Sequence, residues 1–209
     1  APDDFYVANA APSMERYFGT LHLVGNNSTT GGDLGWYTHT KGVWSPSQQL
    51  SFYCSSPPNL VTYKGLLYLF NSTSSGINYS TYQWSAAGGN FTAQQKAVPT
   101  SDPNGYYGCF GSPEVLTFNG KLYCFHVGIY NDNKIYCFSF DGTTWSDDQP
   151  LAPSGTTDYF ETLDQISVVV RNGVVNCLYV DTGRQNVQMF TMDKNGVCSA
   201  SNQTGFQSS

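Results

Sequence analysis

The chain has little charge. Only 11% of its 209 residues are charged, and nine lysines and arginines stand against fifteen acidic residues, which gives a net charge of −6. No run of basic residues occurs anywhere in the sequence. Because proteins hold phosphate-rich partners with clustered positive charge, we predict neither nucleic acid nor an anionic membrane surface as a partner.

A long apolar segment is also missing. No stretch approaches the ~20 apolar residues that span a bilayer, so we predict no membrane insertion. The first residues, A-P-D-D-F-Y, do not show the basic and apolar regions of a signal peptide, although such a segment could already have been removed. A secreted and a cytoplasmic location both stay open, and nothing in the sequence sets an oligomeric state.

Familiar catalytic motifs are absent as well. The sequence contains no G-x-S-x-G, no phosphate-binding loop and no H-E-x-x-H. Its three histidines lack metal-ligand spacing, and its three arginines lie in different parts of the chain, which disfavours a cluster for a substrate carboxylate. We therefore predict no cofactor and no metal.

What the sequence does contain is a repeat. Asn119-Gly120 joins two apolar runs, and this dipeptide is a strong signal for a tight hairpin turn. Similar glycine-centred stretches recur at separations of 46, 55 and 53 residues, and the two remaining ends of the chain together make up 55 residues. Strand-rich repeats of about 50 residues are typical of β-propeller blades. The anchoring glycines are Gly19, Gly65, Gly120 and Gly173.

The third repeat predicts four strands, at 114–118, 121–126, 134–140 and around Trp145, with Asp141-Gly142 as a second tight turn. Trp44, Phe91 and Val197 take the place of Trp145 in the other repeats. We predict an all-β fold: a single four-bladed β-propeller over residues 1–209, with four-stranded antiparallel blades. The ring is closed by joining the N- and C-terminal segments. The repeats span roughly 1–50, 51–104, 105–157 and 158–209.

Six cysteines would allow three disulfides, but the repeat favours free buried thiols. Cys124 and Cys177 fall where the other repeats carry leucine, and Cys137 aligns with aromatic residues and a methionine. Alternatively, Cys124 and Cys137 could face each other across one hairpin. The sequence leaves open the state of Cys54, Cys109 and Cys198.

The two ends of the predicted blades differ. Short turns join the first strand to the second and the third to the fourth, whereas long polar loops join the second to the third. Loops on a rigid scaffold commonly carry function, so we expect a binding site at the long-loop end. An aromatic pair precedes each first strand at this end, and adjacent residues of an extended segment point in opposite directions, so one ring can pack while the other faces solvent. The pairs are Phe5-Tyr6, Phe52-Tyr53, Tyr106-Tyr107 and Tyr159-Phe160.

The stretch N-G-K-L-Y-C-F-H, with Y-C-F-S-F-D-G-T-T-W after it, resembles the repeats of lectin-like β-propeller proteins of fungi and bacteria. S-F-D-G-T-T-W at 139–145 is also similar to the Asp-box of sialidase-type propellers, but it is one residue shorter. The resemblance implies a propeller fold and glycan binding.

We therefore predict a non-catalytic lectin with glycans or glycoproteins as partners. Sugar rings have a flat C–H face that stacks on aromatic rings, and their hydroxyls need short polar partners. Up to four such sites on one scaffold would be multivalent and would agglutinate cells. The predicted ligand-binding residues are the members of the four pairs: Tyr6, Tyr53, Tyr107, Phe160, Phe5, Phe52, Tyr106 and Tyr159.

Two alternatives remain. The acidic stretch D-Y-F-E-T-L-D supplies Asp158, Glu161 and Asp164, which could act with Glu114 in a small glycoside hydrolase, since such enzymes need two carboxylates about 5–10 Å apart. Whether any of the three shares a cleft with Glu114 would decide this. The other alternative is a protein-binding propeller with a defensive role, which sugars would not inhibit.

Overall fold

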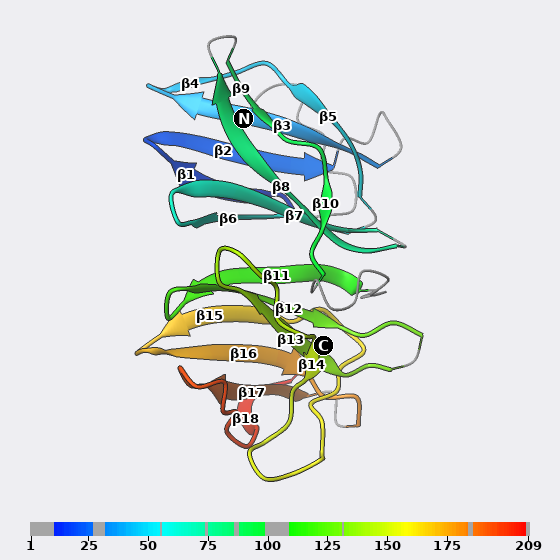
Figure 1. Cartoon of the computed structure of the whole chain (residues 1–209). Coiled ribbons are helices and arrows are strands. Elements are labelled where there is room, and N and C mark those ends of the chain that lie inside the picture. The colour runs from blue at the N-terminus through cyan, green and yellow to red at the C-terminus, as the bar shows by residue number, and fades with distance from the viewer. Residues whose placement is uncertain are drawn as a thin grey trace. The chain divides into compact units, whose positions relative to one another are not determined.

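The computed structural model describes residues 11–26, 32–54, 56–73, 75–85, 88–98, 109–130, 132–183 and 186–207. These residues form β-strands, turns and loops in two compact units, Ala1–Ala97 and Val98–Ser209. We call them the N-terminal unit and the C-terminal unit and describe each by itself (Figure 1). Among the residues described, no helix is long and apolar enough to cross a membrane.

The N-terminal unit holds two antiparallel sheets, each of which is one blade (Figure 1). In both, the outermost strand is interrupted, so that two short segments pair with the third strand: β4 and β5 with β3, and β9 and β10 with β8. The first blade contains β1 (Ser13–Tyr17), β2 (Thr20–Asn26), β3 (Asp33–Thr40), β4 (Val43–Trp44) and β5 (Gln48–Tyr53). The second contains β6 (Asn59–Tyr63), β7 (Leu66–Thr73), β8 (Gly76–Ser85), β9 (Gly88–Phe91) and β10 (Gln95–Lys96).

The C-terminal unit holds the third and fourth blades, each with four strands in sequence order. In the third blade the fourth strand is displaced: Trp145 makes only an isolated bridge to Phe140, and the strand proper forms later. The third blade contains β11 (Phe110–Phe118), β12 (Lys121–Val127), β13 (Ile135–Phe140) and β14 (Gln149–Pro150). The fourth contains β15 (Ser167–Arg171), β16 (Val174–Val180), β17 (Asn186–Met192) and β18 (Asn202–Gln207).

The predicted glycine-centred hairpins are present in all four blades. Each joins the first strand to the second through a two-residue turn with positive φ at both positions, as at Asn119 (47°) and Gly120 (75°). This is the backbone of a type I′ turn, whose twist matches that of the flanking strands. We call the end of each blade with these turns the turn end, and the opposite end, with the second-to-third loops, the loop end.

In every blade, a serine or threonine hydroxyl accepts a hydrogen bond from the third strand at the place where the outer strand is interrupted. Ser199 Oγ accepts a hydrogen bond from the backbone N–H of Thr191 at 3.0 Å, while its own N–H donates to the carbonyl of Thr191 at 2.9 Å. Each of these hydroxyl residues follows a large or apolar residue that packs inward. The residues that pair in this way are Thr38 with Ser45, Thr81 with Thr92, Ser139 with Ser146, and Thr191 with Ser199.

This pattern corrects the predicted alignment of the fourth repeat. Cys198, not Val197, precedes the hydroxyl residue and takes the place of Trp145, since Cys198 is 4% exposed and Val197 is 48% exposed. All the strands of the fourth blade come from 167–207. The predicted joining of the chain ends concerns residues 1–10, which lie outside the described residues.

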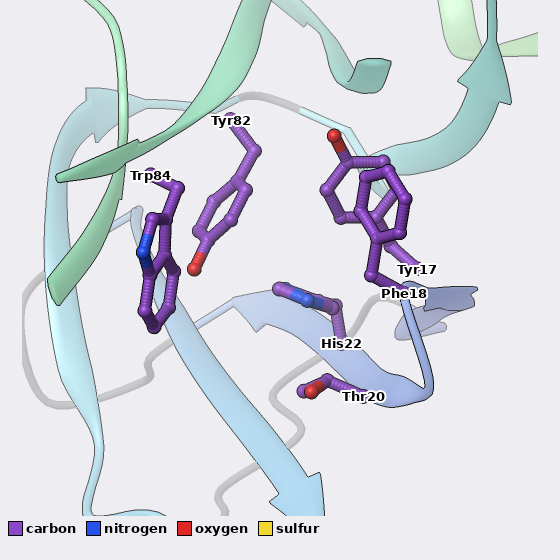
Figure 2. A pocket seen from close by; sticks show the side chains of 6 residues that line it. All are labelled: Tyr17, Phe18, Thr20, His22, Tyr82 and Trp84. Carbon is purple, nitrogen blue, oxygen red and sulfur yellow. The ribbon is translucent and has the colours of Figure 1, made fainter. Parts of the chain in front are cut away.

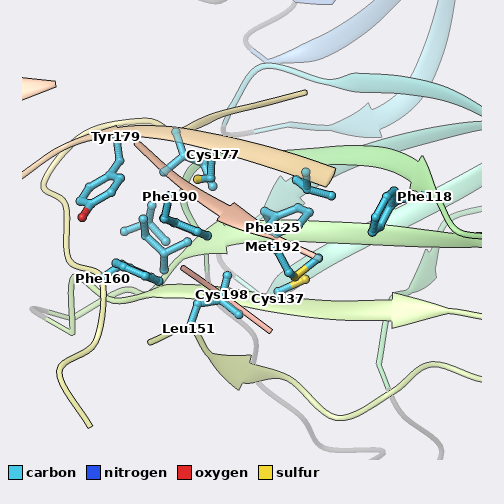
Figure 3. Close-up of a cluster of buried hydrophobic side chains, with 14 residues drawn as sticks. Phe118, Phe125, Cys137, Leu151, Phe160, Cys177, Tyr179, Phe190, Met192 and Cys198 are labelled. Atoms are coloured by element: carbon cyan, nitrogen blue, oxygen red, sulfur yellow. The ribbon is translucent and has the colours of Figure 1, made fainter. Parts of the chain in front are cut away.

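The core of the C-terminal unit lies between its two blades and supports the predicted role of the cysteines (Figure 3). Cys124 and Cys177 are fully buried and Cys137 is 8% exposed. Cys124 pairs with Phe138 across the β12–β13 ladder and Cys137 pairs with Phe125, so the two thiols point to opposite faces of the sheet. The predicted alternative of a disulfide between them is therefore wrong.

We expect Ser199→Ala to lower the free energy of unfolding by about 1–2 kcal/mol, because a partly buried backbone N–H loses its acceptor. Ser167→Ala is the matched control: Ser167 lies on the same blade, is exposed, and should change stability by less than about 0.5 kcal/mol. Urea denaturation followed by circular dichroism measures both. Equal effects of the two substitutions would contradict a stabilising role for the hydroxyl.

Candidate functional site

Two of the four predicted aromatic pairs lie in the described residues, and in both pairs one ring is buried and the other exposed. Tyr53 is 59% exposed and Tyr159 is 40% exposed, whereas Phe52 and Phe160 are 9% and 3% exposed. Phe160 stacks on Phe190 in the core, with ring centroids 4.0 Å apart. The predicted ligand-binding roles of Phe52 and Phe160 are therefore wrong, since a buried ring cannot stack on a sugar. Phe5, Tyr6, Tyr106 and Tyr107 lie outside the described residues.

Tyr159 lies beside a charged cluster at the loop end of the third blade. Lys134 places its Nζ 5.0 Å from the centre of the Tyr159 ring and 2.8 Å from Asp132 Oδ1. The hydroxyl of Tyr136 donates to the other oxygen of Asp132. Partial burial acts to raise the pKa of Asp132, but the hydrogen bonds from Lys134 and Tyr136 outweigh it and lower this pKa overall. Asp132 is thus held as a carboxylate.

Next to this cluster lies a buried pair, His126 and Asp148. His126 Nε2 lies 2.9 Å from Asp148 Oδ2, and the two side chains are 2% and 6% exposed. The imidazole also stacks on Tyr136, with ring centroids 5.4 Å apart. Among the described residues, His126 Nδ1 and Asp148 Oδ1 are buried and have no hydrogen-bond partner. Buried polar atoms are normally satisfied, so both are available to water or to a ligand group.

Glu114 lies on β11, the first strand of the third blade, and its side chain is partly buried. Burial raises its pKa from 4.5 to about 7, so the carboxyl is largely protonated in mildly acidic solution. Burial is also the main cause that raises the pKa of the Cys109 thiol to about 12, and the charges of Asp148 and Glu114 add to it. Both carboxyl groups act on Cys124 in the same way. Glu114 and Asp148 therefore both raise the pKa of these two thiols.

The acidic stretch that the sequence singled out is not joined to Glu114. Asp158, Glu161 and Asp164 are all exposed. Glu161 forms a backbone bridge with Lys134, and Asp164 Oδ1 accepts the N–H of Gln165 at 2.7 Å. In the described part of the chain, no hydrogen bond or ion pair connects any of the three to Glu114.

Sequence reasoning missed Asp148 because it stands in a polar turn, S-D-D-Q, that resembles an ordinary solvated loop. The one available signal was His126, an ionisable residue in the apolar strand K-L-Y-C-F-H-V. A buried histidine needs a partner for its N–H, and the neighbouring strand or loop must supply it. Across the described residues, no group of three or more His, Cys, Asp or Glu side chains is arranged to hold a metal ion.

No family model matches the sequence, and no curated protein matches it. Solved structures do resemble it in fold. A family 117 glycoside hydrolase of the marine bacterium Zobellia galactanivorans is 13% identical, with a TM-score of 0.59 over 93% of this chain and 71% of that chain. An exo-β-1,3-galactanase of Phanerochaete chrysosporium is also 13% identical, with a TM-score of 0.59 over 94% of this chain and 50% of that chain.

The catalytic domain of a GH62 α-L-arabinofuranosidase from Coprinopsis cinerea is 16% identical, with a TM-score of 0.56 over 95% of this chain and 68% of that chain. The chain therefore spans half to about seven tenths of these proteins. At such low identity the likeness shows the fold alone, and the predicted fold of four antiparallel β-propeller blades is confirmed.

The predicted function is corrected by the same comparison. The sequence indicated a non-catalytic, multivalent lectin that agglutinates cells, but the structures that share its fold are glycoside hydrolases, and no lectin family is shown. The sequence misled because aromatic and polar residues at blade ends suit any carbohydrate-directed propeller, whether it hydrolyses sugars or only binds them. The coarser expectation of carbohydrate as the kind of partner agrees with these neighbours.

The raised pKa of Glu114 predicts how the stability of the protein changes with pH. Because its folded pKa of about 7 exceeds the ordinary value of 4.5, the folded state holds the proton more tightly. Its contribution to stability is complete below about pH 4.5 and is lost as the pH rises through 7. The stability of Glu114→Gln relative to the unchanged protein should therefore increase by roughly 2 kcal/mol between pH 5 and pH 8. Urea denaturation of both proteins at the two pH values measures it, and a pH-independent difference would contradict the raised pKa.

Proposed function

We propose that the protein is a glycoside hydrolase in which Glu114 is the general acid. The observation that supports this is the partial burial of Glu114 on the first strand of the third blade, which raises its pKa to about 7. A glycosidase needs a carboxyl group that is still protonated at the working pH, so that it can donate to the oxygen of the leaving group. The hydrolase neighbours in fold favour the same chemistry.

We propose Asp148 as the second carboxyl group of the site. Hydrolysis needs a second carboxylate that activates water or attacks the sugar directly. Asp148 belongs to the same blade as Glu114, and its contact with His126 occupies one of its two oxygens. The other oxygen, Oδ1, has no hydrogen-bond partner among the described residues and can accept a hydrogen bond from a water molecule. Two carboxyl groups in different environments can thus take the roles of acid and base.

The substrate we propose is a neutral glycan. With a net charge of −6, the protein would repel a strongly anionic polymer, whereas the hydroxyls of a neutral sugar are insensitive to this charge. Tyr159 is the aromatic ring best placed to help, because it lies beside Lys134 and Asp132 at the loop end of the same blade. On the N-terminal unit, the exposed ring of Tyr53 remains predicted to stack on a sugar.

The test is turnover of β-1,3-galactotriose, xyloglucan and a chromogenic α-L-arabinofuranoside, the classes that the neighbours' names suggest. We expect release of sugar from at least one, and a loss of about 10²-fold or more in kcat/KM for Glu114→Gln and for Asp148→Asn. Glu161→Gln, which neutralises an exposed carboxylate, is the control and should retain full activity. Full activity of Glu114→Gln, or no turnover on the whole panel, would reject the proposal.

The pH profile gives a second test. A general acid with a pKa of about 7 must be protonated to act, so kcat/KM should fall about tenfold for each unit of pH above 7. The profile is measured with the best substrate from pH 4 to pH 9. A rate that stays level up to pH 9 would exclude Glu114 as the proton donor.

A further inference from the structure

A cavity of about 450 Å³ opens at the turn end of the N-terminal unit. Figure 2 shows Trp84 and Tyr82 on one side and Tyr17 and Phe18 on the other, with His22 and Thr20 between them. The first two residues come from β8 of the second blade, and the others come from the β1–β2 hairpin of the first. The cavity is thus at the opposite end of the blades from the aromatic pairs that the sequence indicated.

Two of its rings are exposed without a visible role in folding. Phe18 is 86% exposed and Trp84 is 79% exposed. Phe18 occupies the first turn position at a φ of 44°, a left-handed conformation that asparagine or glycine adopts more easily. Large exposed aromatic rings that border a cavity are typical of a binding surface. The fold alone would accept a small polar residue at either position.

Polar groups lie between the rings. Trp36 Nε1 donates to His22 Nδ1 at 3.2 Å, so the neutral imidazole carries its hydrogen on Nε2. Burial lowers the pKa of His22 to about 4, which keeps the ring neutral at ordinary pH. The hydroxyl of Thr20 accepts from Thr40 at 3.2 Å and keeps its own hydrogen for donation. The cavity therefore offers donors next to apolar faces.

The absence of a side chain at Gly89 leaves room for the Tyr82 ring. A Cβ atom at Gly89 would stand only 1.6 Å from the Tyr82 hydroxyl, so any side chain at this position would displace the phenol ring. The Tyr82 ring packs edge-on against His22 and Trp36, with centroids 4.9 and 5.5 Å away. The ring, which is 7% exposed, thus has a fixed position from which its hydroxyl meets the cavity.

We propose that this cavity binds a neutral sugar ring, with Trp84 and Phe18 against its C–H faces and His22 and Tyr82 against its hydroxyls. None of the six lining residues is acidic or basic apart from the neutral His22, so nothing there would hold a charged ligand. A wholly apolar ligand would leave the buried N–H of His22 without a partner, which costs free energy. A ring with apolar faces and a hydroxylated rim satisfies both kinds of group.

The cavity is a second carbohydrate site on the proposed enzyme, built from the N-terminal unit alone, whereas Glu114 and Asp148 belong to the C-terminal unit. Its role is to hold a glycan without cleaving it, because none of the described residues that line it has a carboxyl group. The neutral sugar is inferred from the residues that line the cavity and not from the proposed hydrolase activity. The binding proposal can therefore hold or fail independently of the hydrolase proposal.

The experiment is calorimetric titration of the full chain carrying Glu114→Gln, so that turnover does not consume the ligand. The probes are methyl β-D-galactopyranoside, methyl β-D-xylopyranoside and methyl β-D-glucopyranoside. We expect at least one to bind with a millimolar Kd, and Trp84→Ala to weaken it about tenfold or more. Phe18→Asn should also weaken binding, while asparagine suits the turn and keeps the hairpin folded. Tyr130→Ala, which removes an equally exposed ring of the C-terminal unit, is the matched control and should bind as before.

Equal binding by Trp84→Ala and Tyr130→Ala would overturn the proposal, as would no binding of any of the three glycosides. Binding of an apolar naphthalene dye that depends on Trp84, without sugar binding, would assign the cavity to an apolar partner instead. If the sugars bind at this cavity while the hydrolase assays stay silent, only the proposed catalytic function fails.

Discussion

The blades depend on one recurring contact, the hydroxyl group that bonds to the third strand where the outer strand breaks. In each blade a serine or threonine accepts the backbone N–H of a residue seven to eleven positions earlier and donates its own N–H to the same residue. An outer strand that breaks would otherwise leave these backbone groups unpaired, which is costly when they are partly buried. The contact lets each outer strand place a large or apolar residue before the hydroxyl residue and still complete its ladder.

The consequence for packing is visible in the third blade. Ser146 follows Trp145, whose ring is 9% exposed and stacks on Phe140 with centroids 4.6 Å apart. Asp141 supports the same turn by accepting the backbone N–H groups of Thr143 and Thr144 at 2.7 and 2.9 Å. The Asp-box-like motif thus stabilises the turn. Asp148 follows this turn in the chain and contacts His126. The turn at Asp141 and the carboxylate of Asp148 thus belong to one continuous segment, while His126 comes from β12.

The proposed catalytic residues and the proposed binding cavity lie in different units. The C-terminal unit concentrates ionisable side chains whose environments push their pKa values apart, since burial raises that of Glu114 while Lys134 and Tyr136 lower that of Asp132. The cavity of the N-terminal unit is aromatic and nearly free of charge. A carboxyl group with a raised pKa is suited to proton transfer, and neutral rings with fixed donors are suited to holding a sugar. One fold, repeated with different side chains, supplies both environments.

The sequence by itself determined the repeat, the hairpins at its four glycines and the core role of residues such as Cys124. These features follow from local rules, because turn conformation and strand alternation depend on residues close together in the chain. The sequence could not show that Tyr53 and Tyr159 are the exposed members of their pairs, that Asp148 contacts His126, or that Trp84 and Phe18 border one cavity. Those outcomes depend on how whole strands pack, which brings together residues 22 and 66 positions apart and sets their burial. Burial in turn raises the pKa of Glu114, and the hydrogen bond from Trp36 sets the tautomer of His22, so tertiary structure decided where the proposed chemistry lies.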